Sequence, residues 1–68
     1  MIRVHALEAG TGKDLGLWTL DTRPVRGDFV RHRGELYRVG TVVLTEYGTE
    51  IYVAPVDVLD ELERVGAS

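Results

Sequence analysis

Hydrophobic and polar side chains alternate with a period of two in several short runs along the chain, and turn residues separate these runs. Such alternation is typical of strands that have one face on a core and the other in water. Residues branched at Cβ, which favour strands, are abundant: the chain has ten Val, two Ile and six Thr. The pattern predicts five strands, over residues 2–8, 15–20, 28–32, 35–45 and 50–54.

Glycine and proline mark the turns between the predicted strands. Pro24 lacks an amide donor, which indicates a loop between the second and third strands. Arg33 and Gly34 form a tight hairpin after the third strand, and Gly48 supplies the left-handed residue of the next hairpin loop. Gly40, near the middle of the long fourth strand, marks a bulge or bend through which one strand contributes to two sheets.

After Pro55 the spacing of apolar residues changes from that of a strand to that of a helix. Asp57 fits an N-cap, acidic residues follow in the first turn, and Gly66 suits a C-terminal stop. The sequence therefore predicts a short amphipathic helix over residues 57–65. Its apolar stripe, which must dock on the barrel or on a second chain, consists of Val58, Leu59, Leu62 and Val65.

These elements predict a single all-β domain over residues 1–68, a five-stranded antiparallel barrel followed by the short helix. The pattern Pro24-x-x-Gly27-Asp28-x-Val30-x-x-x-Gly34-x-x-Tyr37-x-Val39-x-x-Val42 resembles one found in small SH3-like barrels, including short uncharacterised bacterial and phage-associated proteins. The resemblance implies that the Gly-Asp pair forms a turn leading into a strand and that the valines and the tyrosine fill the core. It also implies that Gly34 makes a tight hairpin. It implies no catalytic position, and an open OB-like barrel is the nearest alternative.

The small size of the chain bears on how it is stabilised. A domain of 68 residues has a small core and usually needs disulfides, a metal, a partner subunit or very efficient packing. The sequence has no cysteine, which excludes disulfides and cysteine-based zinc sites and favours the cytoplasm. We therefore expect a homo-oligomer or a complex with a protein partner. No apolar run is long enough to cross a membrane as a helix, so no membrane association is expected.

Residues that commonly carry catalysis form no recognisable constellation in this sequence. The segment Gly10-Thr11-Gly12-Lys13 is not a phosphate-binding loop, because Leu7 and Asp14 stand where that motif needs glycine and a hydroxyl residue. His5 and His32 are interpreted as ordinary, partly exposed strand residues; the alternative is a divalent-ion site that both histidines share with one carboxylate. We expect no enzymatic activity, no cofactor, no resident metal and no small-molecule substrate.

The aromatic residues divide into core and surface candidates. Trp18 is expected at the centre of the core, because a chain this small has few other side chains large enough to fill it. Either Phe29 or Val30, whichever faces inward, is expected to join it. Tyr47, in a turn, is expected to be exposed.

Charge is unevenly distributed along the chain, whose net charge is −3. Residues 23–38 hold five arginines against Asp28 and Glu35, whereas residues 46–64 hold six acids against one base. The preferred interpretation is that the arginines solubilise an exposed face and pair with the acids of the tail. The alternative is a basic strand ribbon that follows a single-stranded nucleic acid, with Arg23, Arg26, Arg31, Arg33 and Arg38 on phosphates and Tyr37 or Tyr52 stacking on bases.

The favoured function is a non-catalytic module that binds a protein partner or itself, through the stripe of residues 57–65 and the basic ribbon. Single-stranded nucleic-acid binding is the alternative. Steep salt dependence of binding separates the two hypotheses, because contacts to phosphates release counterions.

Overall fold

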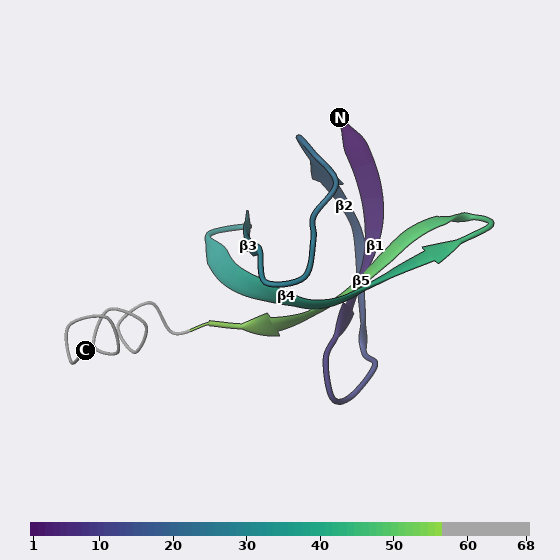
Figure 1. The fold of residues 1–68 in the computed structure, drawn as a ribbon. Coiled ribbons are helices and arrows are strands. Elements are labelled where there is room, and N and C mark those ends of the chain that lie inside the picture. The colour runs from purple at the N-terminus through teal and green to yellow at the C-terminus, as the bar shows by residue number, and fades with distance from the viewer. Residues whose placement is uncertain (57–68) are drawn as a thin grey trace.

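Five strands and no helix make up the part of the chain that the structure, a computed structural model, describes, namely residues 1–56 (Figure 1). The all-β class predicted from the alternating pattern is thereby confirmed, whereas the helix predicted over residues 57–65 lies outside the described residues. The first and fourth strands have the predicted bounds, and the fifth begins two residues earlier than predicted, at Gly48. The strands are β1 (Ile2–Glu8), β2 (Asp14–Leu20), β3 (Phe29–His32), β4 (Glu35–Thr45) and β5 (Gly48–Pro55).

The strands form one mixed sheet in the order β2-β1-β5-β4-β3. Three neighbouring pairs are antiparallel: β1 with β2, β3 with β4, and β4 with β5. At the centre of the sheet, however, β1 and β5 run parallel, with Val4 opposite Thr49 and Glu8 opposite Val53. The prediction of an antiparallel barrel is therefore wrong for this pair. Turn residues fix the direction of strands that follow each other in the chain, but not how two distant strands meet.

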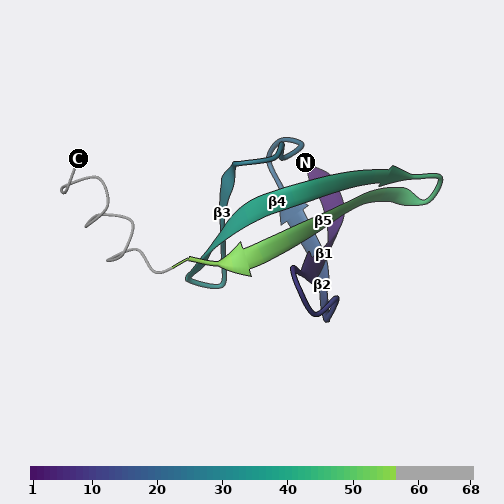
Figure 2. The ribbon, with the colours of Figure 1, turned by 60° about the horizontal axis from the view of Figure 1, so that its bottom comes forward.

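Two bulges interrupt the ladders of the sheet. On β4 the register with β5 shifts between Val39 and Thr41, so Gly40 is the extra residue, at the position where a bulge was predicted. On β2 the extra residue is Leu15, and Gly16 beside it has a φ of 90°. Bulges increase the local twist, and the sheet curls into a half-barrel in which the β4–β5 hairpin crosses β1 and β2 steeply (Figure 1 and Figure 2).

The concave face of the half-barrel carries the core. Trp18 is 1% exposed, in agreement with its predicted place in the core. Of the two neighbours on β3, Val30 packs against the core and Phe29 points outward, 52% exposed. The fully buried apolar side chains are Val4, Ala6, Trp18, Val39, Ile51 and Val53.

Side chains, rather than a backbone ladder, connect the two edge strands across the open side of the half-barrel. The Trp18 ring on β2 stacks on His32 of β3, with ring centroids 4.3 Å apart and planes at 11°. Tyr37 of β4 lies against the same indole at 5.0 Å, and the indole Nε1 donates a hydrogen bond to the Leu15 carbonyl. Within residues 1–56, β2 and β3 do not pair with each other. The aromatic contacts therefore hold the two edges together.

The two hairpin turns of β4 agree with their predicted turn chemistry. Arg33 and Gly34 have φ values of 52° and 82°, the left-handed conformations that a tight two-residue hairpin requires. Gly48 has a φ of 138°, and Tyr47 before it is 92% exposed at the tip of the β4–β5 hairpin, as expected.

Candidate functional site

A cleft of about 350 Å³ lies on the convex face, between the β1–β2 ladder and the tip of the β4–β5 hairpin. The parallel pairing of β1 with β5 creates this cleft, because it sets Glu50 beside His5 and the hairpin tip beside Arg3. Leu17, opposite His5 on β2, and Tyr47 at the tip line it with apolar side chains that are 68% and 92% exposed. We call this surface the convex cleft.

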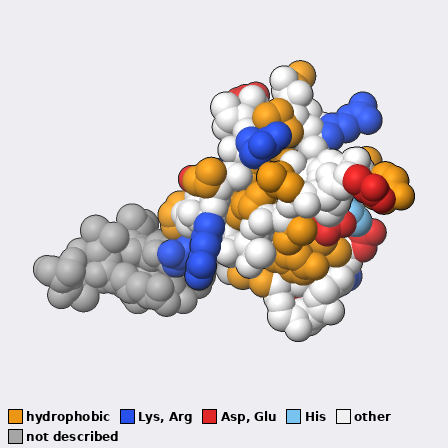
Figure 3. Space-filling model, turned by 45° about the vertical axis from the view of Figure 1, so that its right-hand side comes forward, with side chains coloured by type: hydrophobic (Ala, Val, Ile, Leu, Met, Phe, Trp, Pro, Cys, Tyr) orange, Lys and Arg blue, Asp and Glu red, His pale blue; other side chains and the backbone are white. Residues whose placement is uncertain are grey.

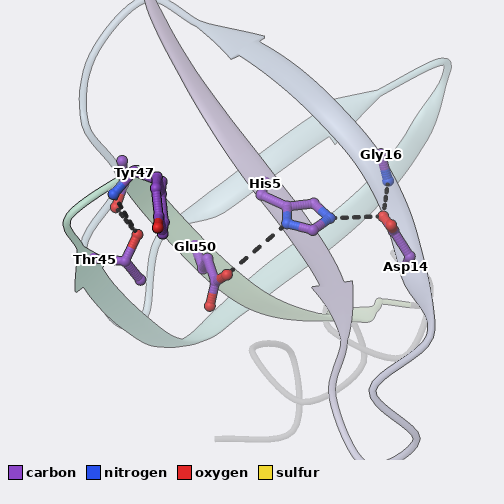
Figure 4. Close-up of polar contacts among 7 residues, drawn as sticks. His5, Asp14, Gly16, Thr45, Tyr47 and Glu50 are labelled. Atoms are coloured by element: carbon purple, nitrogen blue, oxygen red, sulfur yellow. Dashed lines mark hydrogen bonds and ion pairs between the residues drawn. The ribbon is translucent and has the colours of Figure 1, made fainter.

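His5 bridges two carboxylates on the wall of the convex cleft (Figure 4). Its Nε2 lies 2.8 Å from Asp14 Oδ1, and its Nδ1 lies 4.0 Å from Glu50 Oε2. Because the two carboxylates approach opposite nitrogens of one ring, they lie on opposite sides of it and do not converge on a common point. The arrangement fixes the orientation of the imidazole between β2 and β5.

The fold alters the ionisation of Asp14, whose carboxylate lies at the bulge of β2. The backbone N–H of Gly16 donates to Asp14 Oδ1 at 2.7 Å, and His5 contacts the same oxygen. First the Gly16 hydrogen bond and then the His5 hydrogen bond lower the pKa of Asp14 below its ordinary value, because both favour the carboxylate. The Asp14 side chain thus holds the bulge of β2 against β1 in its ionised form.

The tip of the hairpin holds Tyr47 through hydrogen bonds made by Thr45. The Thr45 hydroxyl donates to the Gly48 carbonyl at 3.0 Å and accepts from the Tyr47 backbone N–H at 3.1 Å (Figure 4). The Thr45 hydroxyl and the His5 imidazole of the convex cleft are therefore engaged with groups of the protein itself. What the cleft offers to a ligand is apolar surface with charged groups at its rim.

The predicted arginine ribbon is divided between a loop and two strands. Arg23 and Arg26 lie in the loop before β3, Arg33 lies in the β3–β4 turn, and all five arginines are exposed. Arg31 and Arg38 point to the convex side of β3 and β4, and the Arg38 guanidinium carbon lies 6.0 Å from the centroid of the Phe29 ring. Within residues 1–56 no arginine forms an ion pair with a carboxylate. The acids at 57–63, with which the arginines were expected to pair, lie outside the described residues.

The two tyrosines proposed to stack on bases have different surroundings. Tyr37 lies on the core side against Trp18, so it does not share a face with Arg31 and Arg38. Tyr52 is half-buried and pairs with Leu7 across the β5–β1 ladder. The aromatic ring that lies beside Arg31 and Arg38 is Phe29, which was not predicted from the sequence to contact a ligand. The alternation of the strand could have indicated this position. Adjacent residues of a strand point to opposite faces, so Phe29 must face outward if Val30 faces the core.

The two histidines lie on opposite faces of the sheet, which argues against the metal site considered for them. His32 stacks on Trp18 on the core side, whereas His5 belongs to the convex cleft. In the described part of the chain, no three His, Asp or Glu side chains are placed to hold a metal ion. The proposed interface residues Val58, Leu59, Leu62 and Val65 lie outside the described residues.

Apolar and charged side chains are interspersed on the face that includes the hairpin tip, and a histidine there lies between acidic groups (Figure 3).

Comparison of the chain with protein-family models, with curated proteins and with solved structures finds no match. Over residues 1–56, the structure has no helix of the length and hydropathy that a membrane span requires. Functional inference therefore rests on the geometry of these surfaces.

Proposed function

We propose that the protein is a non-catalytic interaction module that associates with a second copy of itself through the convex cleft. The observation that carries the proposal is the exposure of Leu17 and Tyr47, 68% and 92%, in one cleft. Apolar side chains that are gathered in a hollow gain more from association than the same side chains scattered over the surface.

The charges at the rim favour a second copy over an unrelated partner. Arg3 and Glu50 both line the convex cleft, so the surface carries a cation and an anion on neighbouring strands. In a twofold dimer the same patch faces itself, so Arg3 of one chain can meet Glu50 of the other, and Glu50 of the first chain can meet Arg3 of the second. A patch with both signs of charge can satisfy this arrangement, whereas a patch of one sign repels its copy.

Binding is proposed rather than catalysis because the imidazole and the Thr45 hydroxyl of the cleft already have partners. His5 is held by Asp14, and the Thr45 hydroxyl is held by Gly48 and Tyr47. A cytoplasmic location and kinship with small SH3-like barrels are further parts of the proposal. The conformations of Gly27 and Gly34, with φ values of 95° and 82°, and the burial of Val39 support the kinship.

Light scattering at two protein concentrations tests the self-association. We expect the mass of two chains for the wild-type protein and of one chain for the variant Leu17→Ser/Tyr47→Ser. Both side chains are exposed, so the double variant should retain the circular-dichroism spectrum of the folded protein.

Phe29→Ser is the matched control, because Phe29 is also an exposed aromatic residue but lies outside the convex cleft. It should retain the mass of two chains. A wild-type protein of one-chain mass at both concentrations would overturn the proposal. A dimer that survives Leu17→Ser/Tyr47→Ser but is lost in Leu62→Ser would also overturn it, in favour of the predicted stripe of residues 57–65.

A further inference from the structure

Phe29 lies at the centre of an arginine surface on the convex side of β3 and β4. Phe29 and Arg31 alternate outward along β3, while Val30 and His32 turn toward the core. Arg38 is the cross-strand partner of Phe29, and its guanidinium lies near one side of the ring. A separation of 6.0 Å is at the outer limit of a cation–π contact, and the ring remains 52% exposed. A planar ligand group can therefore stack on it.

The loop before β3 adds a third arginine to this surface. The Gly27 N–H donates to the Val39 carbonyl at 2.8 Å, and the Val39 N–H donates to the Asp28 carbonyl at 2.9 Å. These two hydrogen bonds fasten the loop along β4. As a result, Arg26 and Arg38 line one hollow of about 220 Å³ together with Gly27, Val39 and Gly40.

Two acids, Asp21 and Asp28, line a hollow together with Phe29 and Arg31, but within residues 1–56 neither forms an ion pair with an arginine. Asp28 directs its carboxylate at the backbone, where Oδ2 accepts a hydrogen bond from the Val25 N–H at 2.9 Å. Arg31 makes a long contact of 3.4 Å to the Gly34 carbonyl, and neither Arg26 nor Arg38 forms an ion pair within residues 1–56. The surface thus presents three guanidinium groups and an exposed ring, although the whole chain has a net charge of −3.

We propose that Arg26, Phe29, Arg31 and Arg38 form a binding surface for single-stranded nucleic acid. The ring of Phe29 stacks on a base, and the three arginines contact phosphates on either side of it. An acidic peptide would use the arginines but has no need of an exposed aromatic ring between them. A base has a flat face that fits such a ring, which favours the nucleic acid.

Fluorescence anisotropy of a short labelled oligonucleotide of mixed sequence measures this binding, in titrations with the wild-type chain at several salt concentrations. Three phosphate contacts predict that the logarithm of the binding constant falls with the logarithm of salt concentration with a slope of about −2. Phe29→Ala should weaken binding about fivefold or more, as loss of one stacked base does, and Phe29→Trp should restore it. Arg31→Gln/Arg38→Gln should bring the slope close to −1.

Lys13→Gln is the matched control, because Lys13 is an exposed cation in the turn between β1 and β2, outside this surface and outside the convex cleft. It should leave the affinity unchanged. Absence of oligonucleotide binding would overturn the proposal, and so would equal binding by wild type and Phe29→Ala. Equally tight binding of polyglutamate, with no effect of Phe29→Ala, would assign the surface to acidic peptides instead.

The inference does not depend on the proposed self-association. Leu17→Ser/Tyr47→Ser changes only the convex cleft, and it should bind the oligonucleotide as the wild-type chain does. Phe29→Ala should weaken oligonucleotide binding as stated above and keep the wild-type mass. Each proposal can therefore fail while the other stands.

Discussion

Trp18 lies on an edge strand, yet its side chain is 1% exposed, because the curl of the sheet brings His32 and Tyr37 against its indole. Asp14, on the same strand, is exposed but has a structural role. Its carboxylate accepts hydrogen bonds from Gly16 and His5, and these hydrogen bonds hold the bulge of β2 in place. At the level of single residues, the buried ring of Trp18 and the exposed carboxylate of Asp14 thus hold the edge strand β2 in place.

Asp14→Asn should reduce stability in a manner that depends on pH. The folded state lowers the pKa of Asp14, so the unfolded state binds its proton more tightly, and ionisation stabilises the fold at pH values above the ordinary pKa of about 3.9. As pH falls through the lower pKa of the folded state, this contribution is lost. Asparagine keeps an oxygen that can accept from Gly16 but carries no charge.

Urea unfolding of both proteins at a series of pH values measures the difference. The wild-type protein should be more stable at neutral pH, and the two curves should converge in acid. Asp21→Asn is the control, since the Asp21 carboxylate makes no hydrogen bond or ion pair with residues 1–56. If the difference in the free energy of unfolding between wild type and Asp14→Asn stays constant as the pH falls below the ordinary pKa of Asp14, the ionised carboxylate does not stabilise the fold.

The β3–β4 hairpin shows how local chemistry sets an element. Arg33 adopts a φ of 52°, which is unfavourable for most residues other than glycine, asparagine and aspartate. Gly34 follows with a φ of 82°. The pair therefore forms the left-handed turn that matches the twist of β3 and β4, although its first position holds a residue that is poorly suited to it.

Arg33→Asn should stabilise the protein by an amount on the order of 1 kcal/mol, because asparagine tolerates the left-handed conformation and Asn-Gly favours this turn. For a domain of this size, that gain corresponds to a rise in Tm of roughly 4–8 °C. Gly34→Ala should lower Tm by a similar amount, since alanine at a φ of 82° is strained. Thermal unfolding followed by circular dichroism measures both. A lower Tm for Arg33→Asn would show that the arginine side chain contributes more than the turn.

Residues 1–56 form one sheet, and within them the two edge strands contact each other through side chains and not through a backbone ladder. β1 and β5 have neighbours on both sides, whereas β2 and β3 each pair on one side. β3 has four residues, and the stack of His32 on Trp18 links it to the opposite edge. Opening of this edge therefore requires less disruption than opening of the centre.

Amide hydrogen exchange should be slowest in β1 and β5 and faster in β3. His32→Ala removes the stacked ring and should accelerate exchange in β3 by roughly 2- to 10-fold, the equivalent of one aromatic pair. The amides of β1 and β5 should change less. Uniform acceleration across all strands would show instead that His32 supports the whole core.

Much of the fold could be predicted where it depends on neighbours in the chain. The alternation in β1, the bulge at Gly40 and the turn at Arg33-Gly34 are local features, and the structure contains all three. The run of arginines was visible in the same way. The grouping of Arg31 and Arg38 with Phe29 on the convex side was not, because it depends on which residue of β3 faces the core.

Local patterns in the chain are sufficient to indicate the strands and the turns between them, because backbone conformation and side-chain alternation act between residues a few positions apart. The parallel pairing of β1 with β5, the contact of Trp18 with His32 and the cleft shared by Leu17 and Tyr47 depend instead on long-range packing. These contacts join segments that are far apart in the chain. Their geometry follows from how the whole sheet buries its apolar face, which local preferences do not specify.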